Sequence, residues 1–297
     1  MKRKFHKVGV LMGGPSAERP VSLRSGAAVA NGLRACGYEV VEIDLETEEV
    51  NIPSGVEAVF IALHGTFGED GKVQAVLCER GIPYTGAGAE ASRVCFDKCL
   101  TKKMLDHSKV PTPEYEILRK GDRRTLSLPV VVKPPRQGSS IGVHIVFEES
   151  KWDSALADAL SHDGEALVES FIAGAELTVG IVGDTVLPVI EIRAPQGFYD
   201  YDAKYTKGKT EYLVPAPISA GSEKNCRELA LKTYNLLGCR DLGRVDFRMD
   251  SEGRLFVLEV NSIPGFTETS LLPKAARAAG IEFPALCDRI MNMASVH

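Results

Sequence analysis

The chain has 297 residues, of which 44% are apolar and 25% are charged, with a formal net charge of −5 and a pI near 5.8. This length exceeds what one hydrophobic core usually fills, so two or three domains are expected. The acidic balance argues against a nucleic-acid or membrane partner, and no apolar run approaches the roughly 18 residues of a membrane helix. Seven scattered cysteines are typical of free thiols, so we expect a cytoplasmic protein.

The N-terminal region, to about residue 90, alternates predicted strands and helices. Strands are expected at 7–12, 38–45 and 58–63, and a helix from Pro20 to Gly37, which predicts a parallel sheet with crossover helices. Ligands on such sheets bind beyond the carboxyl ends of the strands, which here carry residues 13–18 and 64–71. The glycines could also form only a tight turn. Because neither run matches the G-x-G-x-x-G fingerprint, a nucleotide-dependent oxidoreductase is only an alternative.

The central region carries a possible phosphate site. A helix is expected from Ser92 to about Asp106, followed by strands at 128–133, 141–146, 166–172 and 177–182 and a helix at 150–160. The loop 134–140 offers the backbone N–H groups and hydroxyls of Ser139 and Ser140, with Lys133 as a fixed positive charge at its base. This is not the Walker arrangement, so a flexible surface turn is the alternative.

Residues 193–215 show no regular period and contain four tyrosines between Tyr199 and Tyr212. A connection of this length is usually disordered or a functional lid, and the aromatic residues argue against simple disorder. A helix at 223–237 and another at 270–279 are expected on either side of a hairpin. The N-terminus of the second helix could bind a carboxylate.

The hairpin spans Arg244 to Asn261, with a loop expected at Glu252 and Gly253. The register then places three apolar pairs on one face, which are Val245 with Val260, Phe247 with Leu258, and Met249 with Phe256.

The other face of this hairpin pairs Arg244 with Asn261 and Asp246 with Glu259. Two bare carboxylates roughly 5 Å apart would repel by about 3 kcal/mol at an effective dielectric near 20, so a cation is expected between them. Oxygen-only ligands favour Mg²⁺ or Mn²⁺ over zinc, and Mg²⁺ is usually completed by water and phosphate oxygens. The hairpin therefore predicts a metal site beside a nucleotide.

Six runs of residues support a specific resemblance. They are Gly13–Arg19, Ala62–Gly65, Gly68–Gly71, Gly138–Gly142, Tyr199–Tyr201 with Lys204 and Tyr205, and Leu258–Asn261 with Pro264 and Gly265. In this order they resemble the D-alanine–D-alanine ligases of the ATP-grasp superfamily, from Val8 to about Ala285. Pro15 and Gln137 depart from the commonest family pattern, in which threonine and glutamate are frequent there. Neither departure removes a residue assigned to chemistry.

The resemblance implies an α/β (α+β) ATP-grasp fold. A Rossmann-like parallel-sheet domain (1–95) would precede two α+β subdomains that sandwich ATP. The subdomain 96–178 would carry the phosphate loop, and 179–297 the lid at about 193–215 and the metal site.

The resemblance also implies roles for individual residues. ATP would be bound by Lys98, Lys133, Ser139, Ser140 and Lys204, with Glu169 and Ile172 near the adenine and Glu176 on the ribose. Two Mg²⁺ (or Mn²⁺) ions would be shared by Asp246, Glu259 and Asn261. The first D-alanine would meet Glu18, His64 and Arg244. The oxyanion would meet Arg244 and the Gly265 N–H, and the second carboxylate would meet Ser270 and Leu271. Glu18, Ser139 and Tyr205 would form a trio that closes the lid.

The implied activity is ATP-dependent joining of two D-alanine molecules through D-alanyl phosphate, for peptidoglycan synthesis, by a homodimer. A related ligase that uses D-lactate, D-serine or another amino acid as second substrate is the alternative, although Tyr205 in an Ala-Lys-Tyr setting favours the dipeptide. A non-catalytic nucleotide sensor is a further alternative, against which the intact carboxylates and lysines argue.

Overall fold

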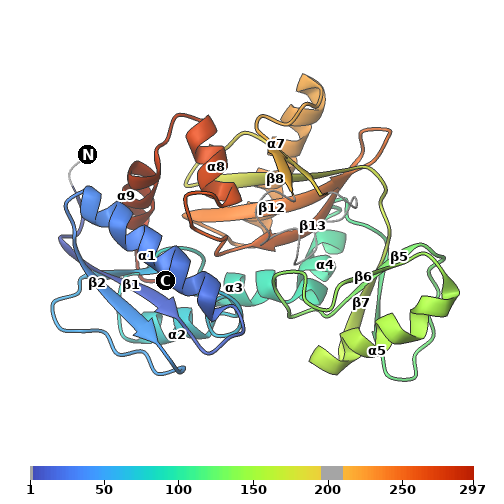
Figure 1. The fold of residues 1–297 in the computed structure, drawn as a ribbon, viewed down its shortest axis with the longest axis horizontal. Coiled ribbons are helices and arrows are strands. Elements are labelled where there is room, and N and C mark those ends of the chain that lie inside the picture. Colours follow the sequence, from blue (N-terminus) through green and yellow to red (C-terminus); the bar gives the residue numbers. More distant parts are fainter. Residues whose placement is uncertain (1–2, 195–209) are drawn as a thin grey trace.

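The computed structural model describes residues 3–194 and 210–297 (Figure 1). The first of the sheets in these residues is parallel, with the order β2-β1-β3, as the alternation of strands and helices predicts. Its strands are β1 (Lys7–Gly13), β2 (Glu39–Leu45) and β3 (Ala58–Ile61). Helices α1 (Arg19–Ala35) and α2 (Lys72–Glu79) accompany it, and α1 carries a proline in its first turn.

Two short helices lead from this sheet to the next. A single helix is predicted here, but the chain forms α3 (Ala89–Phe96) and α4 (Lys98–His107). The break lies at Asp97, whose backbone is extended (φ −88°, ψ 101°) and whose carboxylate accepts hydrogen bonds from the N–H groups of Cys99 and Leu100. Aspartate favours such a cap over a helix interior because its side chain satisfies the free N–H groups of the first turn.

The second sheet is antiparallel, with the order β4-β7-β5-β6. Its strands are β4 (Tyr115–Arg119), β5 (Val130–Lys133), β6 (His144–Val146) and β7 (Glu165–Ser170). A short 3₁₀ turn (Glu149–Lys151) and helix α5 (Trp152–Asp163) pack on it. The apolar side chains between α5 and this sheet form a core of their own.

The third sheet is also antiparallel, with the order β11-β10-β8-β12-β13 and β9 paired with β8 (Figure 1). Its strands are β8 (Ala175–Val182), β9 (Thr185–Val186), β10 (Ile190–Arg193), β11 (Glu211–Leu213), β12 (Leu242–Met249) and β13 (Leu255–Asn261). The later helices are α7 (Ala220–Leu236), α8 (Leu271–Ala278) and α9 (Phe283–Met293).

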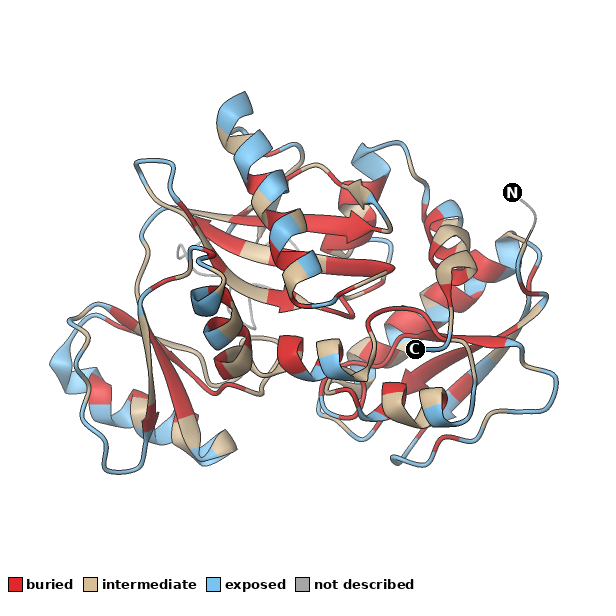
Figure 2. Cartoon of the chain, turned by 180° about the vertical axis from the view of Figure 1, so that it is seen from behind, coloured by how far each residue is buried: buried red, intermediate tan, exposed pale blue. Residues whose placement is uncertain are grey.

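Buried residues are red in Figure 2, and apolar side chains among them join the first sheet to the third. One continuous apolar cluster contains Val10 of β1, Val182 of β8, Leu272 of α8 and Ile290 of α9. The second sheet contributes nothing to that cluster. The three sheets follow one another along the chain in the order expected for domains 1–95, 96–178 and 179–297, and these boundaries stay a prediction.

The β12–β13 hairpin differs in part from its predicted register. Pairs from Arg244–Asn261 to Asp246–Glu259 are as expected, but the register then shifts, so that Phe247 pairs with Val257 and Met249 with Leu255. The hydrogen bond from the Asp250 N–H to the Arg254 carbonyl closes a three-residue loop in which Gly253 has a φ of +78°. The odd loop length is compensated by a β-bulge, which turns Leu258 away from the core.

Candidate active site

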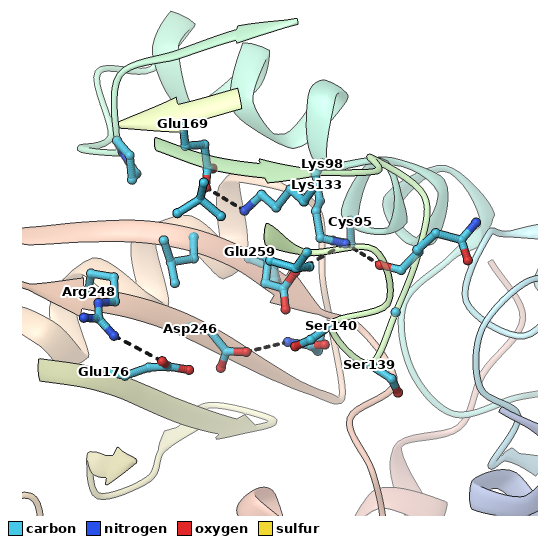
Figure 3. A pocket seen from close by; sticks show the side chains of 18 of the residues that line it. Cys95, Lys98, Lys133, Ser139, Ser140, Glu169, Glu176, Asp246, Arg248 and Glu259 are labelled. Carbon is cyan, nitrogen blue, oxygen red and sulfur yellow. Dashed lines mark hydrogen bonds and ion pairs between the residues drawn. The ribbon is translucent and has the colours of Figure 1, made fainter. Parts of the chain in front are cut away.

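A pocket lies between the second and third sheets, where α3 ends and α4 begins (Figure 3). Most predicted nucleotide and metal residues line it, together with Arg244, which was predicted to contact the substrate and the oxyanion. The nucleotide and metal residues are Lys98, Lys133, Ser139, Ser140, Glu169, Ile172, Glu176, Asp246, Glu259 and Asn261. The predicted residues therefore converge from two sheets, the start of helix α4 and two connecting segments.

A buried cluster of two lysines and one glutamate lies at one wall of the pocket, which Lys133 and Glu169 line. Lys133 ends β5, and its ammonium lies 2.7 Å from one carboxylate oxygen of Glu169 on β7. The ammonium of Lys102, on α4, lies 2.5 Å from the other oxygen. Burial would raise the pKa of Glu169, but the two ammonium groups outweigh it and lower that pKa. Glu169, predicted near the adenine, thus pairs with the predicted phosphate lysine, and sequence analysis missed Lys102.

The loop after β5 connects this wall to the first sheet. Ser139 and Ser140 have positive φ angles of 53° and 59°, and the Ser139 hydroxyl donates a hydrogen bond to the carboxylate of Glu18. A Cβ added at Gly138 would come 2.6 Å from that carboxylate, so the loop backbone passes close to the Glu18 side chain. Lys98 donates to the Gln137 carbonyl at 2.8 Å. Glu18 precedes α1 and lines a second hollow together with Pro20, Val21 and Ser139.

The two opposed carboxylates of the hairpin each have a cationic partner. Arg244 donates twice to Asp246, at 2.8 and 2.7 Å, and Lys98 lies 3.4 Å from Glu259. Asp246 also accepts from the Thr178 hydroxyl at 2.5 Å and the Asn261 amide at 3.0 Å. The predicted pairing is correct, but side-chain cations balance these anions, so the repulsion argument by itself does not require a metal.

The donor set nevertheless fits Mg²⁺ or Mn²⁺. Asp246, Glu259 and Asn261 offer only oxygen ligands once the Asn261 side-chain amide rotates so that its oxygen faces the ion. Mg²⁺ commonly binds one or two carboxylates, with water and phosphate completing its shell. Within 3–194 and 210–297 no group of three or more His, Cys, Asp and Glu residues is placed to hold a metal. The proposed site has only two such residues, Asp246 and Glu259, because its third ligand is the amide of Asn261.

The opposite end of the pocket contains Arg248, which sequence analysis missed. Its guanidinium donates to the carbonyls of Ile172 and Gly174, at 3.1 and 2.9 Å, and to Glu176 at 3.2 Å. It also lies over the Phe171 ring, 5.9 Å from the centroid. Arg248 is two residues beyond Asp246 on β12, so strand alternation already placed it on the pocket face.

The expected D-alanine residues lie beside this pocket. His64 is buried, with one ring nitrogen 3.1 Å from the Ser25 hydroxyl and the other 3.2 Å from Glu69, which lines the pocket. The Ser25 hydroxyl also accepts from the N–H of Phe266 at 3.3 Å. His64 is therefore tied to the loop that contains Gly265.

Ser270 is the N-cap of α8, and its hydroxyl accepts from the Thr267 N–H at 3.0 Å. The Leu271 side chain is buried in the core, so Leu271 can offer only its backbone N–H to a ligand. Lys204, Tyr205 and most of the predicted lid lie outside the described residues.

Two antiparallel sheets with a pocket of lysines and carboxylates between them, beside a parallel N-terminal sheet, define the ATP-grasp class of ligase. Family models of the D-ala D-ala ligase C-terminus and N-terminus match residues 103–292 and 45–87. The chain belongs to the D-alanine–D-alanine ligase family.

Individual relatives agree with this assignment. A D-alanine–D-alanine ligase of Syntrophotalea carbinolica is 48% identical over 98% of this chain and 96% of its own. The structure of the Bacillus anthracis D-alanine–D-alanine ligase complexed with ATP is 34% identical, with a TM-score of 0.85 over 96% of each chain. The Enterococcus faecalis VanG D-Ala:D-Ser ligase has the same TM-score at 29% identity, over 98% of this chain and 99% of its own. The shared fold thus does not distinguish the second substrate.

Proposed function

We propose that this protein joins two D-alanine molecules into D-alanyl-D-alanine for peptidoglycan synthesis, with ATP converted to ADP and phosphate. The observation that carries the proposal is the convergence of Lys98, Lys133 and Arg244 with the Asp246–Glu259 pair in one pocket. Anionic phosphates need such cations, and a metal needs such carboxylates. The relatives at 48% identity and the ATP complex of the Bacillus anthracis ligase support it.

ATP would lie along the pocket, with its phosphates near Lys98, Lys133, Ser139 and Ser140. Its ribose would face Glu176, and its adenine the connection that contains Ile172. The described lysines would neutralise the phosphate charge, which is most of what phosphoryl transfer requires of a protein. Lys204 is proposed as a further phosphate ligand from the predicted lid.

Asp246, Glu259 and Asn261 would hold two Mg²⁺ or Mn²⁺ ions. When bound, such ions supply charge neutralisation on the transferred phosphoryl group. Binding of metal would compete with Arg244 for Asp246, since Arg244 occupies both carboxylate oxygens. Arg244 would then be available to the substrate.

In the first step, the carboxylate of one D-alanine attacks the γ-phosphate, which gives D-alanyl phosphate and ADP. Glu18 would hold the ammonium of that D-alanine, with His64 and Arg244 near its carboxylate. In the second step, the amine of another D-alanine attacks the acyl carbon, and phosphate leaves. Arg244 and the Gly265 N–H would stabilise the oxyanion, while Ser270 and the Leu271 N–H would hold the second carboxylate.

The proposal includes a lid, a location and an assembly state. Tyr205 would join Glu18 and Ser139 to close the site, because water would hydrolyse the acyl phosphate.

None of the helices in the described segments is long and apolar enough to cross a bilayer. We place the enzyme in the cytoplasm as a homodimer, and light scattering of the purified protein tests the assembly state.

Product analysis by mass tests the proposed reaction. With ATP, Mg²⁺ and D-alanine alone, we expect D-alanyl-D-alanine and equimolar ADP. Absence of ADP release above background would refute the proposal. The rival, a ligase that takes D-serine or D-lactate second, is kept because the D-Ala:D-Ser ligase shares the fold equally well. Competition of each second substrate with D-alanine separates the two.

A further inference from the structure

Lys102 is a lysine with 0% of its surface exposed, on α4. Its ammonium contacts Glu169 at 2.5 Å, the Thr112 hydroxyl and, at 3.4 Å, the carbonyl of Val257. The Tyr115 ring lies 6.0 Å away. Lysine is almost never fully buried unless it is paired, because desolvation of the charge is costly. The position of this lysine therefore needs an explanation beyond packing.

Each partner of Lys102 belongs to a different part of the candidate active site. The other oxygen of Glu169 holds Lys133 at 2.7 Å, and Lys133 lines the pocket. Val257 lies beside the β-bulge that precedes Glu259, and Thr112 also donates to its carbonyl at 2.7 Å. The Lys102 ammonium thus lies between the wall that carries the phosphate lysine and the strand that carries the proposed metal ligand.

The charges of this cluster decide what Lys102 contributes. Glu169 carries one negative charge between two ammonium groups, so the cluster has a net charge of +1. Without Lys102 the cluster would be neutral, and Glu169 would cancel the charge that Lys133 presents to the pocket. Lys102 does not itself line the pocket, so any effect on a ligand must pass through its partners.

We propose that Lys102 is a positioning residue of the nucleotide site: it holds Glu169 and balances its charge, so that Lys133 presents a full positive charge to the phosphate chain. The inference rests on the proposed function only in taking the ligand to be a nucleoside triphosphate with its diphosphate product. Burial lowers the pKa of Lys102 to about 8, and Glu169 partly opposes this shift, whereas Lys133 adds to it and Glu259 opposes it. The residue is therefore cationic at neutral pH.

The test measures ADP affinity by calorimetry, which needs no turnover. Lys102→Met, which keeps the length but removes the charge, is expected to weaken ADP about tenfold, as the loss of one charge-assisted contact would. Lys102→Arg keeps the charge and should restore most of the affinity. Lys103→Met is the matched control, because Lys103 is the next residue of the same helix and is exposed.

A second background separates charge balance from a merely structural role. In Glu169→Gln the anion is absent, so adding Lys102→Met should weaken ADP by less than about twofold, a non-additive result. An equal loss in both backgrounds, or no loss in the wild-type background, would overturn the proposal. If Lys102→Met does not fold, Lys102→Gln replaces it with the same expectations. Normal ADP binding without ligation of D-alanine would count against the proposed function alone.

Discussion

Two neighbouring lysines on α4 occupy opposite environments. Lys102 is fully buried against Glu169, whereas Lys103 is exposed. The sequence presents both as ordinary polar positions of a helix, and nothing in a pair of adjacent lysines indicates which one is buried. This is why sequence analysis found Lys133 and Glu169 but missed the second lysine that Glu169 holds.

The buried position of Lys102 predicts a specific pH dependence of stability. Its pKa is about 8 in the folded protein and near 10.5 when unfolded, so the unfolded chain binds more protons between these values. The burial cost, about 3 kcal/mol, is present below pH 8 and is relieved as pH rises toward 10.5. The free energy of unfolding of the wild type should therefore rise relative to Lys102→Met between pH 7.5 and 9.5, by about 2 kcal/mol.

Urea denaturation at a series of pH values measures this difference. Lys103→Met is the control, and its curve should run parallel to that of the wild type. A constant difference between wild type and Lys102→Met across the range would show that Lys102 does not titrate there.

Glu259 lies opposite Asp246 and is one of the two carboxylates proposed to hold the metals. We expect Glu259→Gln to abolish turnover, because it removes one of two carboxylate ligands while keeping the size of the side chain. Initial rates over a range of Mg²⁺ concentrations check this, and added Mg²⁺ should recover activity only in part. Wild-type rates at low Mg²⁺ would contradict the metal assignment.

Tyr205 lies outside the described residues, and its role stays a prediction from the family resemblance. Tyr205→Phe should loosen lid closure and relax the choice of second substrate. With D-lactate and D-alanine both present, the ratio of D-alanyl-D-lactate to dipeptide is measured across pH. This ratio is expected to be higher in Tyr205→Phe than in the wild type. An unchanged ratio would argue against Tyr205 as a selector.

The β12–β13 hairpin shows how far strand alternation determines a site. The pairs nearest the proposed metal site were predictable because polar and apolar residues alternate strictly from Arg244 to Phe247. Residues 255–258 are all apolar, so no period defines their core face, and the three-residue loop and bulge could not be read from them. Alternation from Asp246 would also have put Arg248 on the pocket face, although sequence analysis missed it, and only the structure shows which carbonyls it binds.

The connection between β7 and β8 depends on a glycine. Gly174 has a φ of +136°, and an added Cβ would come 2.0 Å from the Met249 carbonyl oxygen. Gly174→Ala should therefore cost about 3 kcal/mol or more, through both backbone strain and a clash with main chain. It should also weaken ADP binding, since Arg248 holds the Gly174 carbonyl at the end of the pocket proposed for the ribose and adenine.

Gly164 provides the matched control for this substitution. Its φ is also positive, at +71°, but no atom lies within 4 Å of an added Cβ. Gly164→Ala should cost only about 1 kcal/mol, from backbone strain alone. Urea denaturation compares the two variants, and equal costs would show that the connection can move away from β12.

On the scale of the whole molecule, the first and third sheets share an apolar cluster, whereas the second sheet has its own core. The contact between Ser139 and Glu18 joins the phosphate loop of the second sheet to the start of α1. We expect Ser139→Ala to raise the KM for D-alanine about tenfold, because Glu18, the proposed ammonium ligand, loses a charge-assisted hydrogen bond. ADP affinity should fall less, since Lys98 and Lys133 remain. Steady-state kinetics and calorimetry check the two quantities, with Ser161→Ala on the exposed face of α5 as the control. A KM for D-alanine that stays at the wild-type value in Ser139→Ala would mean that Glu18 is positioned without this contact.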